Sequence, residues 1–193
     1  MSQTAILAAP VDIVGAAESC FARFGVAKTT VEDIAAGAGV SRATVYRHFP
    51  GGRDEIILAV LLRSAQAFLP QLPARLGSAR SVGDAIVDLV VSAVEWVRSE
   101  PWRVRMLASP LSRTAEASDA AAIYAACTEF IAPYFSQARA AGMVRRGVQL
   151  PDAVEYVVRM IHSLLVVPGH RDRSVDELRR YVRTYVVGAL LVR

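Results

Sequence analysis

Apolar residues recur along almost the whole chain at spacings of three and four, which is the period of an amphipathic helix. The first stripe runs from about Val11 to Phe24 and ends at Gly25, a residue type favoured for a left-handed cap. Its inward positions are predicted to be Ile13, Val14, Ala17, Phe21 and Phe24. No alternating strand pattern with hairpin turns is found along the sequence. The pattern therefore predicts an all-α fold.

The later stripes predict a second, larger helical unit. A helix from about Asp54 to Phe68 is expected to be broken by the stretch from Pro70 to Gly77. Ser81 to Ser99 is nearly apolar all round, which is typical of a central helix in a bundle. The remaining helices are predicted near Arg103–Ala108, Ala120–Ala141, Asp152–Val167 and Ser174–Val192. Whether the apolar face of the last one is core or partner surface stays open.

The segment AAGAGVSRATVYRHF, residues 35 to 49, has the features of a helix-turn-helix corner. Thr30 can cap the helix that precedes the corner, and Ser41 can cap the helix that follows it. Gly39 can open the turn in a left-handed conformation. The inward positions of the two helices and the turn are predicted to be Ile34, Ala35, Val40, Val45 and Phe49. The side chains left at the surface or its edges are Arg42, Ala43, Thr44, Tyr46, Arg47 and His48.

The position of the charged residues says more about this surface than the net charge of the chain does. The 193 residues carry a net charge of +4, with 53% hydrophobic and 21% charged residues. Residues 1 to 55 carry five basic and six acidic side chains, yet Gly39 to Arg53 contains three arginines and no acid. Arginine can bond guanine O6 and N7, threonine can meet a thymine methyl, and tyrosine and histidine can reach phosphates or bases. These residues therefore predict double-stranded DNA as the partner.

The block from about Phe24 to Ile57, FGVAKTTVEDIAAGAGVSRATVYRHFPGGRDEII, resembles the DNA-binding domain of the TetR family of bacterial transcriptional regulators. The resemblance rests on Phe24-Gly25, Thr29-Thr30, Ile34-Ala35, Ala38-Gly39-Val40-Ser41, Thr44, Tyr46 and His48-Phe49. It implies that Arg42, Ala43, Thr44 and Arg47 face bases and that Thr30, Tyr46 and His48 lie at or near phosphates. The turn Pro50-Gly51-Gly52 is one residue longer than is usual in the family, so Arg53 is expected as a shifted phosphate contact.

The resemblance further implies a DNA-binding domain at residues 1–54 and a helical effector-binding and dimerisation domain at residues 55–193. The homodimer interface is expected on residues 152–167 and 174–192. A dimer also suits the physics, because one recognition helix neutralises few phosphates and a palindromic operator is read by a symmetric pair. The large or polarisable side chains of the predicted pocket helices are Trp96, Trp102, Met106, Tyr124, Phe130, Tyr134 and His162. Most are expected to be core residues, and mostly apolar walls predict a hydrophobic effector.

Two other classes of protein compete with a ligand-responsive repressor. An enzyme on a helical bundle is disfavoured, because the sequence offers no nucleophile and base pair, metal cluster or phosphate-binding glycine loop. His162 has no second ligand at metal spacing, and no cofactor is expected. A helical module that binds protein stays open, as does activation in place of repression. The N-terminus lacks the features of a signal peptide and no membrane span is expected, so the prediction is a cytoplasmic protein.

Overall fold

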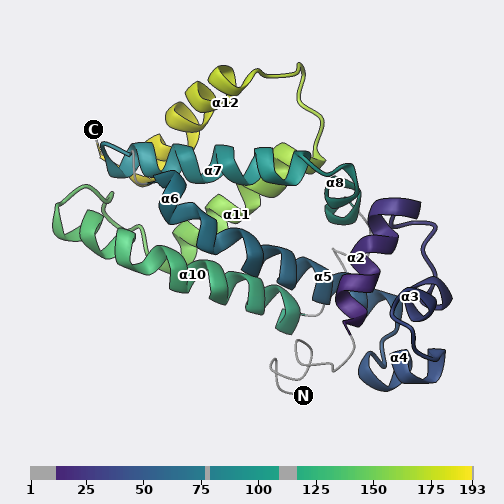
Figure 1. The fold of residues 1–193 in the computed structure, drawn as a ribbon. Helices are drawn as coiled ribbons and strands as arrows, with labels where there is room; N and C mark the ends of the chain where they lie inside the picture. Colours follow the sequence, from purple (N-terminus) through teal and green to yellow (C-terminus); the bar gives the residue numbers. More distant parts are fainter. Residues whose placement is uncertain (1–11, 77–78, 109–116, 193) are drawn as a thin grey trace. The chain divides into compact units, whose positions relative to one another are not determined.

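The computed structural model describes residues 12–76, 79–108 and 117–192. Its contacts divide the chain into two compact units, Met1–Gln66 with Glu100–Ala120 and Ala67–Ser99 with Ala121–Arg193. The described residues form helices and turns with no strand, and one isolated bridge joins Val144 and Leu191 (Figure 1). The predicted all-α fold is confirmed.

The first unit contains the predicted helix-turn-helix. Its helices are α2 (Ile13–Phe24), α3 (Val31–Gly37), α4 (Arg42–His48), most of α5 (Arg53–Phe68) and α8 (Pro101–Leu107). Phe21 and Phe49 are fully buried at the centre of its core, and Trp102 of α8 lies 6.5 Å from Phe21, centroid to centroid. The side chains of α8 therefore complete the core of this unit, although residues 67–99 of the second unit separate α8 from the other helices in sequence.

The inward stripe of α2 departs from the prediction at one end. Phe24 is 45% exposed, and the guanidinium of Arg23 lies 5.0 Å from its ring centroid. Cys20 is buried instead, and its thiol lies 3.6 Å from the carbonyl oxygen of Asp33. The shift occurs in the last turn of the helix, where Gly25 turns the chain at a φ of 82°.

Helical structure continues past the predicted break at Pro70. After α5 comes a short 3₁₀ turn, η1 (Leu69–Gln71), and then α6 (Leu72–Leu76). Pro70 and Pro73 lie in the first turns of η1 and α6, where a missing N–H costs no helical hydrogen bond. The resulting stretch, Arg53–Ala74, is long and apolar enough to cross a membrane by length and composition alone. Its apolar side chains Ile56, Ile57, Val60, Phe68 and Leu72 are buried in the protein, which is typical of a core helix.

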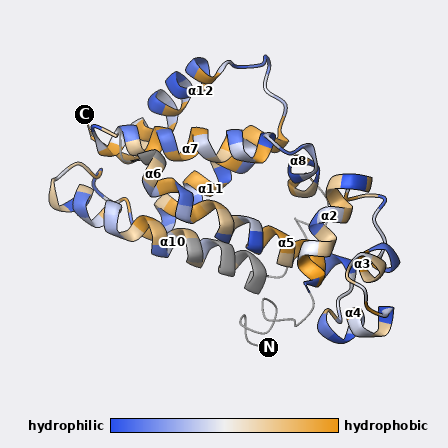
Figure 2. Ribbon diagram, in the orientation of Figure 1, coloured by the Kyte–Doolittle hydropathy of each residue, from blue (hydrophilic) through white to orange (hydrophobic). Residues whose placement is uncertain are grey.

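The second unit is built around α7 (Val82–Arg98). Its other helices are η1, α6, α10 (Ala117–Ala140, from Ala121 onward), α11 (Leu150–Val166), α12 (Val175–Val182), a π-helical turn η2 (Arg183–Val187) and α13 (Gly188–Leu190). Helix α7 contacts α6, α11 and α12 (Figure 1), and hydrophobic residues alternate with hydrophilic ones along it (Figure 2). Val90 and Val91 have no exposed surface, and the buried core around them is almost entirely aliphatic.

The C-terminal helix is interrupted by the π-turn η2. In such a turn the backbone hydrogen bonds span one residue more than in an α-helix, so a carbonyl at the transition loses its regular partner. The Tyr156 hydroxyl of α11 donates to the carbonyl of Tyr185 at 3.0 Å and supplies a side-chain partner there. The buried side chains Leu178, Val182, Val186 and Leu190 follow one another at intervals of four residues across the turn. Ala189, the neighbour of Leu190 in sequence, is exposed.

Candidate nucleic-acid interface and ligand pocket

The corner between α3 and α4 has the geometry that its sequence predicts. Gly39 adopts a φ of 67°, the left-handed conformation that glycine reaches without a Cβ clash. The amide of Val40 donates to the carbonyl of Ala35 at 2.9 Å and closes the turn. Ile34, Ala35 and Val45 are buried where the two helices cross. The corner therefore fixes the angle between α3 and α4 within the first unit.

Helix α4 presents one polar face to solvent. Ser41 caps it, because its hydroxyl accepts from the amide of Thr44 at 3.1 Å. Val45 is the buried residue of α4, and Phe49, at its C-terminal cap, is also buried. The predicted DNA-facing residues Arg42, Ala43, Tyr46 and Arg47 are exposed, and Thr44 and His48 are half-buried. The helix thus displays two guanidinium groups and the Tyr46 phenol in a single seven-residue segment.

Thr30 caps α3 through a reciprocal capping box. The amide of Asp33 donates to the Thr30 hydroxyl at 3.2 Å, and the Thr30 amide donates to the Asp33 carboxylate at 2.8 Å. The Thr30 hydroxyl also donates to that carboxylate at 2.7 Å. These hydrogen bonds from Thr30 hold the pKa of Asp33 below its ordinary value. The Thr30 hydroxyl is therefore engaged in the cap, and its phosphate contact stays a prediction.

Arg53 was expected to contact a phosphate, but its side chain hydrogen-bonds to backbone carbonyls within the protein. Its Nε donates to the carbonyl of Thr29 at 3.0 Å, and one Nη donates to the carbonyl of Val26. Both acceptors belong to buried residues of the turn between α2 and α3. The guanidinium thus ties the start of α5 to the turn that leads into Thr30, and a phosphate contact from its other Nη stays a prediction.

An acid that the local sequence pattern did not reveal joins this surface. Glu32 of α3 lies with its Oε1 2.6 Å from Nη1 of Arg42. The segment Gly39 to Arg53 contains no acid, but the fold brings this carboxylate to it from the preceding helix. Because the pair depends on how α3 and α4 cross, spacing along the chain gave no signal for it.

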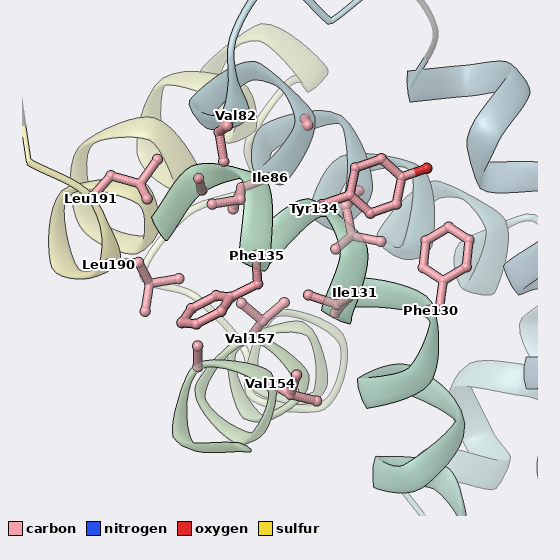
Figure 3. Close-up of a pocket in the computed structure, with 14 residues that line it drawn as sticks. Val82, Ile86, Phe130, Ile131, Tyr134, Phe135, Val154, Val157, Leu190 and Leu191 are labelled. Carbon is pink, nitrogen blue, oxygen red and sulfur yellow. The ribbon is translucent and has the colours of Figure 1, made fainter. Parts of the chain in front are cut away.

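The second unit contains an apolar pocket between α7, α10, α11 and the C-terminal segment (Figure 3). The cavity among its side chains has a volume of about 70 Å³. The Tyr134 hydroxyl is the one side-chain oxygen among the residues drawn in Figure 3. The lining residues are Val82, Ala85, Ile86, Leu89, Phe130, Ile131, Tyr134, Phe135, Ala138, Ala153, Val154, Val157, Leu190 and Leu191. Such a lining suits a hydrophobic ligand.

Of the residues predicted for the pocket, Phe130 and Tyr134 line it. Trp102 and Met106 belong to the core of the first unit instead. Trp96 packs on Phe68, with ring centroids 5.0 Å apart, in another cluster of the second unit. Tyr124 and His162 are half-buried and do not line the pocket. The prediction favoured large aromatic side chains, whereas most of the lining is aliphatic.

Two further groups of residues bear on chemistry. Burial raises the pKa of the Cys20 and Cys127 thiols, which keeps both in the protonated, weakly nucleophilic form at neutral pH. Within the ranges that the structure describes, no three His, Cys, Asp or Glu side chains gather in a way that could hold a metal ion. Both thiols are free cysteines.

A glycine corner between two capped helices, with arginines exposed on the second, defines the class of helix-turn-helix DNA-binding proteins. Residues 13–60 match the family described as "Bacterial regulatory proteins, tetR family". An HTH-type transcriptional regulator of Mycobacterium bovis is 31% identical over 135 residues, which cover 70% of this chain and 69% of that protein. The chain belongs to the tetR family of bacterial transcriptional regulators.

Solved structures of other regulators share the fold over most of the chain. The fatty acid degradation regulator FadR from Bacillus halodurans aligns with a TM-score of 0.67 at 15% identity, covering 91% of this chain and 92% of its own. The regulator FadR from Bacillus subtilis, solved in complex with stearoyl-CoA, aligns with a TM-score of 0.67 at 14% identity, covering 91% and 96%. At these identities the likeness concerns the fold, and the relatives are transcriptional regulators rather than enzymes.

Proposed function

We propose that this regulator is a cytoplasmic repressor that binds a palindromic operator as a homodimer and is released by a small hydrophobic effector. The observation that carries the effector class is the apolar pocket, whose lining includes a single hydroxyl, that of Tyr134. A ligand with a long apolar part loses water from its surface there without leaving polar groups unpaired. The stearoyl-CoA complex of FadR makes long-chain acyl compounds the first effectors to test.

The pocket is also placed to couple ligand binding to the C-terminal helices. Leu190 and Leu191, which follow the π-turn, form part of its wall. The amide of Val192 donates to the carbonyl of Met143 at 2.9 Å, which fixes this segment against the turn after α10. A ligand that displaces Leu190 or Leu191 would shift the population between two arrangements of the C-terminal segment. Release from DNA follows when the favoured arrangement spaces the recognition helices wrongly for successive major grooves.

Dimerisation is proposed through residues 152–167 and 174–192. This part of the chain leaves large apolar side chains exposed, with Val167 and Tyr185 each 60% accessible and Val175 46% accessible. The Tyr185 ring also contacts the Tyr181 ring in a tilted arrangement, with ring centroids 4.8 Å apart, so this segment carries an aromatic pair. Exposed apolar surface of this kind is typical of a partner interface.

The DNA-binding face is proposed to use Arg42, Ala43, Thr44 and Arg47 toward bases, with Tyr46, His48, Thr30 and Arg53 toward phosphates. The exposure of Arg42, Arg47 and Tyr46 supports this assignment. Selection of bound duplexes from a random library by the purified protein tests it, and a palindrome with two half-sites is expected. Recovery of no enriched sequence would contradict operator binding.

The enriched duplex then serves as the probe for effector release. Acyl-CoA compounds and free fatty acids of increasing length are titrated into the protein–DNA complex, and loss of fluorescence anisotropy is measured. The variant Ala85→Leu places a larger side chain in the pocket wall and should weaken the response to effector while DNA affinity is kept. Ala125→Leu, the same change at an exposed position of α10, is the matched control. Equal effector responses of the two variants would rule out this pocket as the effector site.

A further inference from the structure

Glu32 and Arg42 form an ion pair on the DNA-binding surface. The Arg42 Nη1 lies 2.6 Å from Oε1 of Glu32, and both side chains are well exposed, at 60% and 49%. Arg42 is the first residue of α4, and Glu32 is the second residue of α3. Arg47, one and a half turns further along α4, has no ion pair with any acid in the described part of the chain. The two arginines of the recognition helix therefore differ in electrostatic state.

The two arginines should respond differently to DNA that carries the wrong sequence. A guanidinium without an acid partner can neutralise any phosphate within reach, and this charge term dominates non-specific binding. A guanidinium held by a carboxylate has part of its charge compensated and one Nη occupied, so it gains less from a phosphate. It still has donors on its other edge, because a guanidinium carries five N–H groups in a fixed fork. Guanine offers O6 and N7 to such a fork in the major groove.

We propose that Glu32 is a specificity-determining residue of this regulator and acts by positioning Arg42. The carboxylate restrains the Arg42 side chain at the start of the recognition helix and suppresses its use as a general phosphate contact. An operator with the correct base pair then meets an oriented guanidinium, whereas DNA of another sequence gains little affinity from Arg42. This inference rests on the base-reading role proposed for Arg42.

A simpler explanation is that Glu32 only stabilises α3, because an acid in the first turn of a helix interacts favourably with the helix dipole. Asp33, in the same turn, serves α3 through the capping box with Thr30. The Glu32 carboxylate instead lies within ion-pair distance of a residue on the neighbouring helix. Asp54 in the first turn of α5 provides a comparison, because it is an exposed first-turn acid in the same unit.

The test compares wild type with Glu32→Gln, Asp54→Asn, Arg42→Ala and the double variant Glu32→Gln/Arg42→Ala. Each protein is used as the full chain, and its thermal midpoint is measured first to verify folding. Bound duplexes are selected from a random library in parallel. Affinity is then measured by fluorescence anisotropy on the selected operator and on a scrambled duplex over a series of salt concentrations.

Glu32→Gln should tighten binding to the scrambled duplex by about 3-fold for each recognition helix, and so by about 10-fold for a dimer, the scale of an exposed ion pair. The slope of log affinity against log salt on that duplex should steepen by about 0.9 per recognition helix, because Arg42 becomes free to neutralise a phosphate. The base preference at one position of each half-site should relax. Asp54→Asn should leave that preference unchanged, and Glu32→Gln should have no effect on it in the Arg42→Ala background.

Three results would overturn the proposal in different ways. If wild type enriches a motif and Glu32→Gln enriches the same motif with the same strength, Glu32 does not set specificity while operator binding stands. If Glu32→Gln tightens all duplexes equally with or without Arg42, the carboxylate repels DNA directly and does not act through Arg42. If wild type enriches no sequence, both operator recognition and this inference fail.

Discussion

Removal of the Arg53 guanidinium distinguishes an internal tie from a phosphate contact. The Nε of Arg53 donates to the carbonyl of Thr29 at 3.0 Å, and one Nη donates to the carbonyl of Val26. Thr29 and Val26 are only 2% and 3% exposed, so water has little access to these residues once the guanidinium is gone. Arg53→Met keeps an unbranched apolar stem and removes both donors.

The magnitude follows from these two hydrogen bonds. A hydrogen bond from a charged group contributes about 1.5–3 kcal/mol, and a buried acceptor left without a partner costs about 1–3 kcal/mol. Because Arg53 is half-buried, the lower end applies to each bond, and Arg53→Met should lower the free energy of unfolding by about 3 kcal/mol. Lys28→Met, a charge removal at an exposed position of the same turn, should change it by less than about 0.5 kcal/mol.

Two assays measure this prediction. Urea denaturation followed by far-UV circular dichroism gives the free energy of unfolding, and anisotropy titrations across salt concentrations give the slope of DNA affinity. If Arg53 is an internal tie, its loss should weaken binding to all duplexes because the DNA-binding domain is less stable. The slope of log affinity against log salt should stay unchanged, because no phosphate contact is lost. Unchanged stability together with a slope reduced by about 0.9 per subunit would show that Arg53 contacts phosphate and that the tie is unimportant.

Three further substitutions test other parts of the structure. Gly52→Ala should lower the free energy of unfolding by about 1–2 kcal/mol and weaken DNA binding, because Gly52 has a φ of 64° and its new Cβ would lie 3.2 Å from the Tyr46 ring; calorimetry and anisotropy measure the two effects. Arg171 and the Ser174 amide lower the Glu177 pKa to about 2, so the stabilising ion pair should be present above the ordinary pKa of 4.5 and be lost as pH falls toward 2; Arg171→Gln should raise that pKa in an NMR titration. Tyr156→Phe should cost about 1 kcal/mol by removing the hydrogen bond to the π-turn, and an unchanged denaturation midpoint would contradict that role.

The local signals of the sequence predicted the helix-turn-helix well. Capping by Thr30 and Ser41 and the left-handed turn at Gly39 depend on residues within four positions of each other, so spacing along the chain is enough to find them. The exposed face of α4 could also be predicted from local spacing. Val45 and Phe49, four residues apart, are buried on one side and leave the arginines on the other.

The pocket could be predicted only in part. Trp102 and Met106 had the size expected of ligand contacts, but α8 contributes them to the core of the first unit, a long-range event that no local pattern encodes. The aliphatic residues that line most of the pocket have the same spacing and character as core residues. The Glu32–Arg42 pair was missed because it depends on the crossing of α3 and α4. Side chains from separate helices become a site only when the tertiary structure brings them together.

The π-turn has a consequence for comparing relatives of this regulator. In an α-helix each step of four residues rotates a side chain by about 40° beyond a full turn, so buried positions spaced by four drift off the core face within about three steps. The wider turn at Arg183–Val187 cancels this drift and keeps Val182, Val186 and Leu190 on one side. The helix therefore carries one extra residue for the same rise. A relative with an uninterrupted α-helix here should align with a single-residue gap, and beyond that gap equivalent positions differ by one in number.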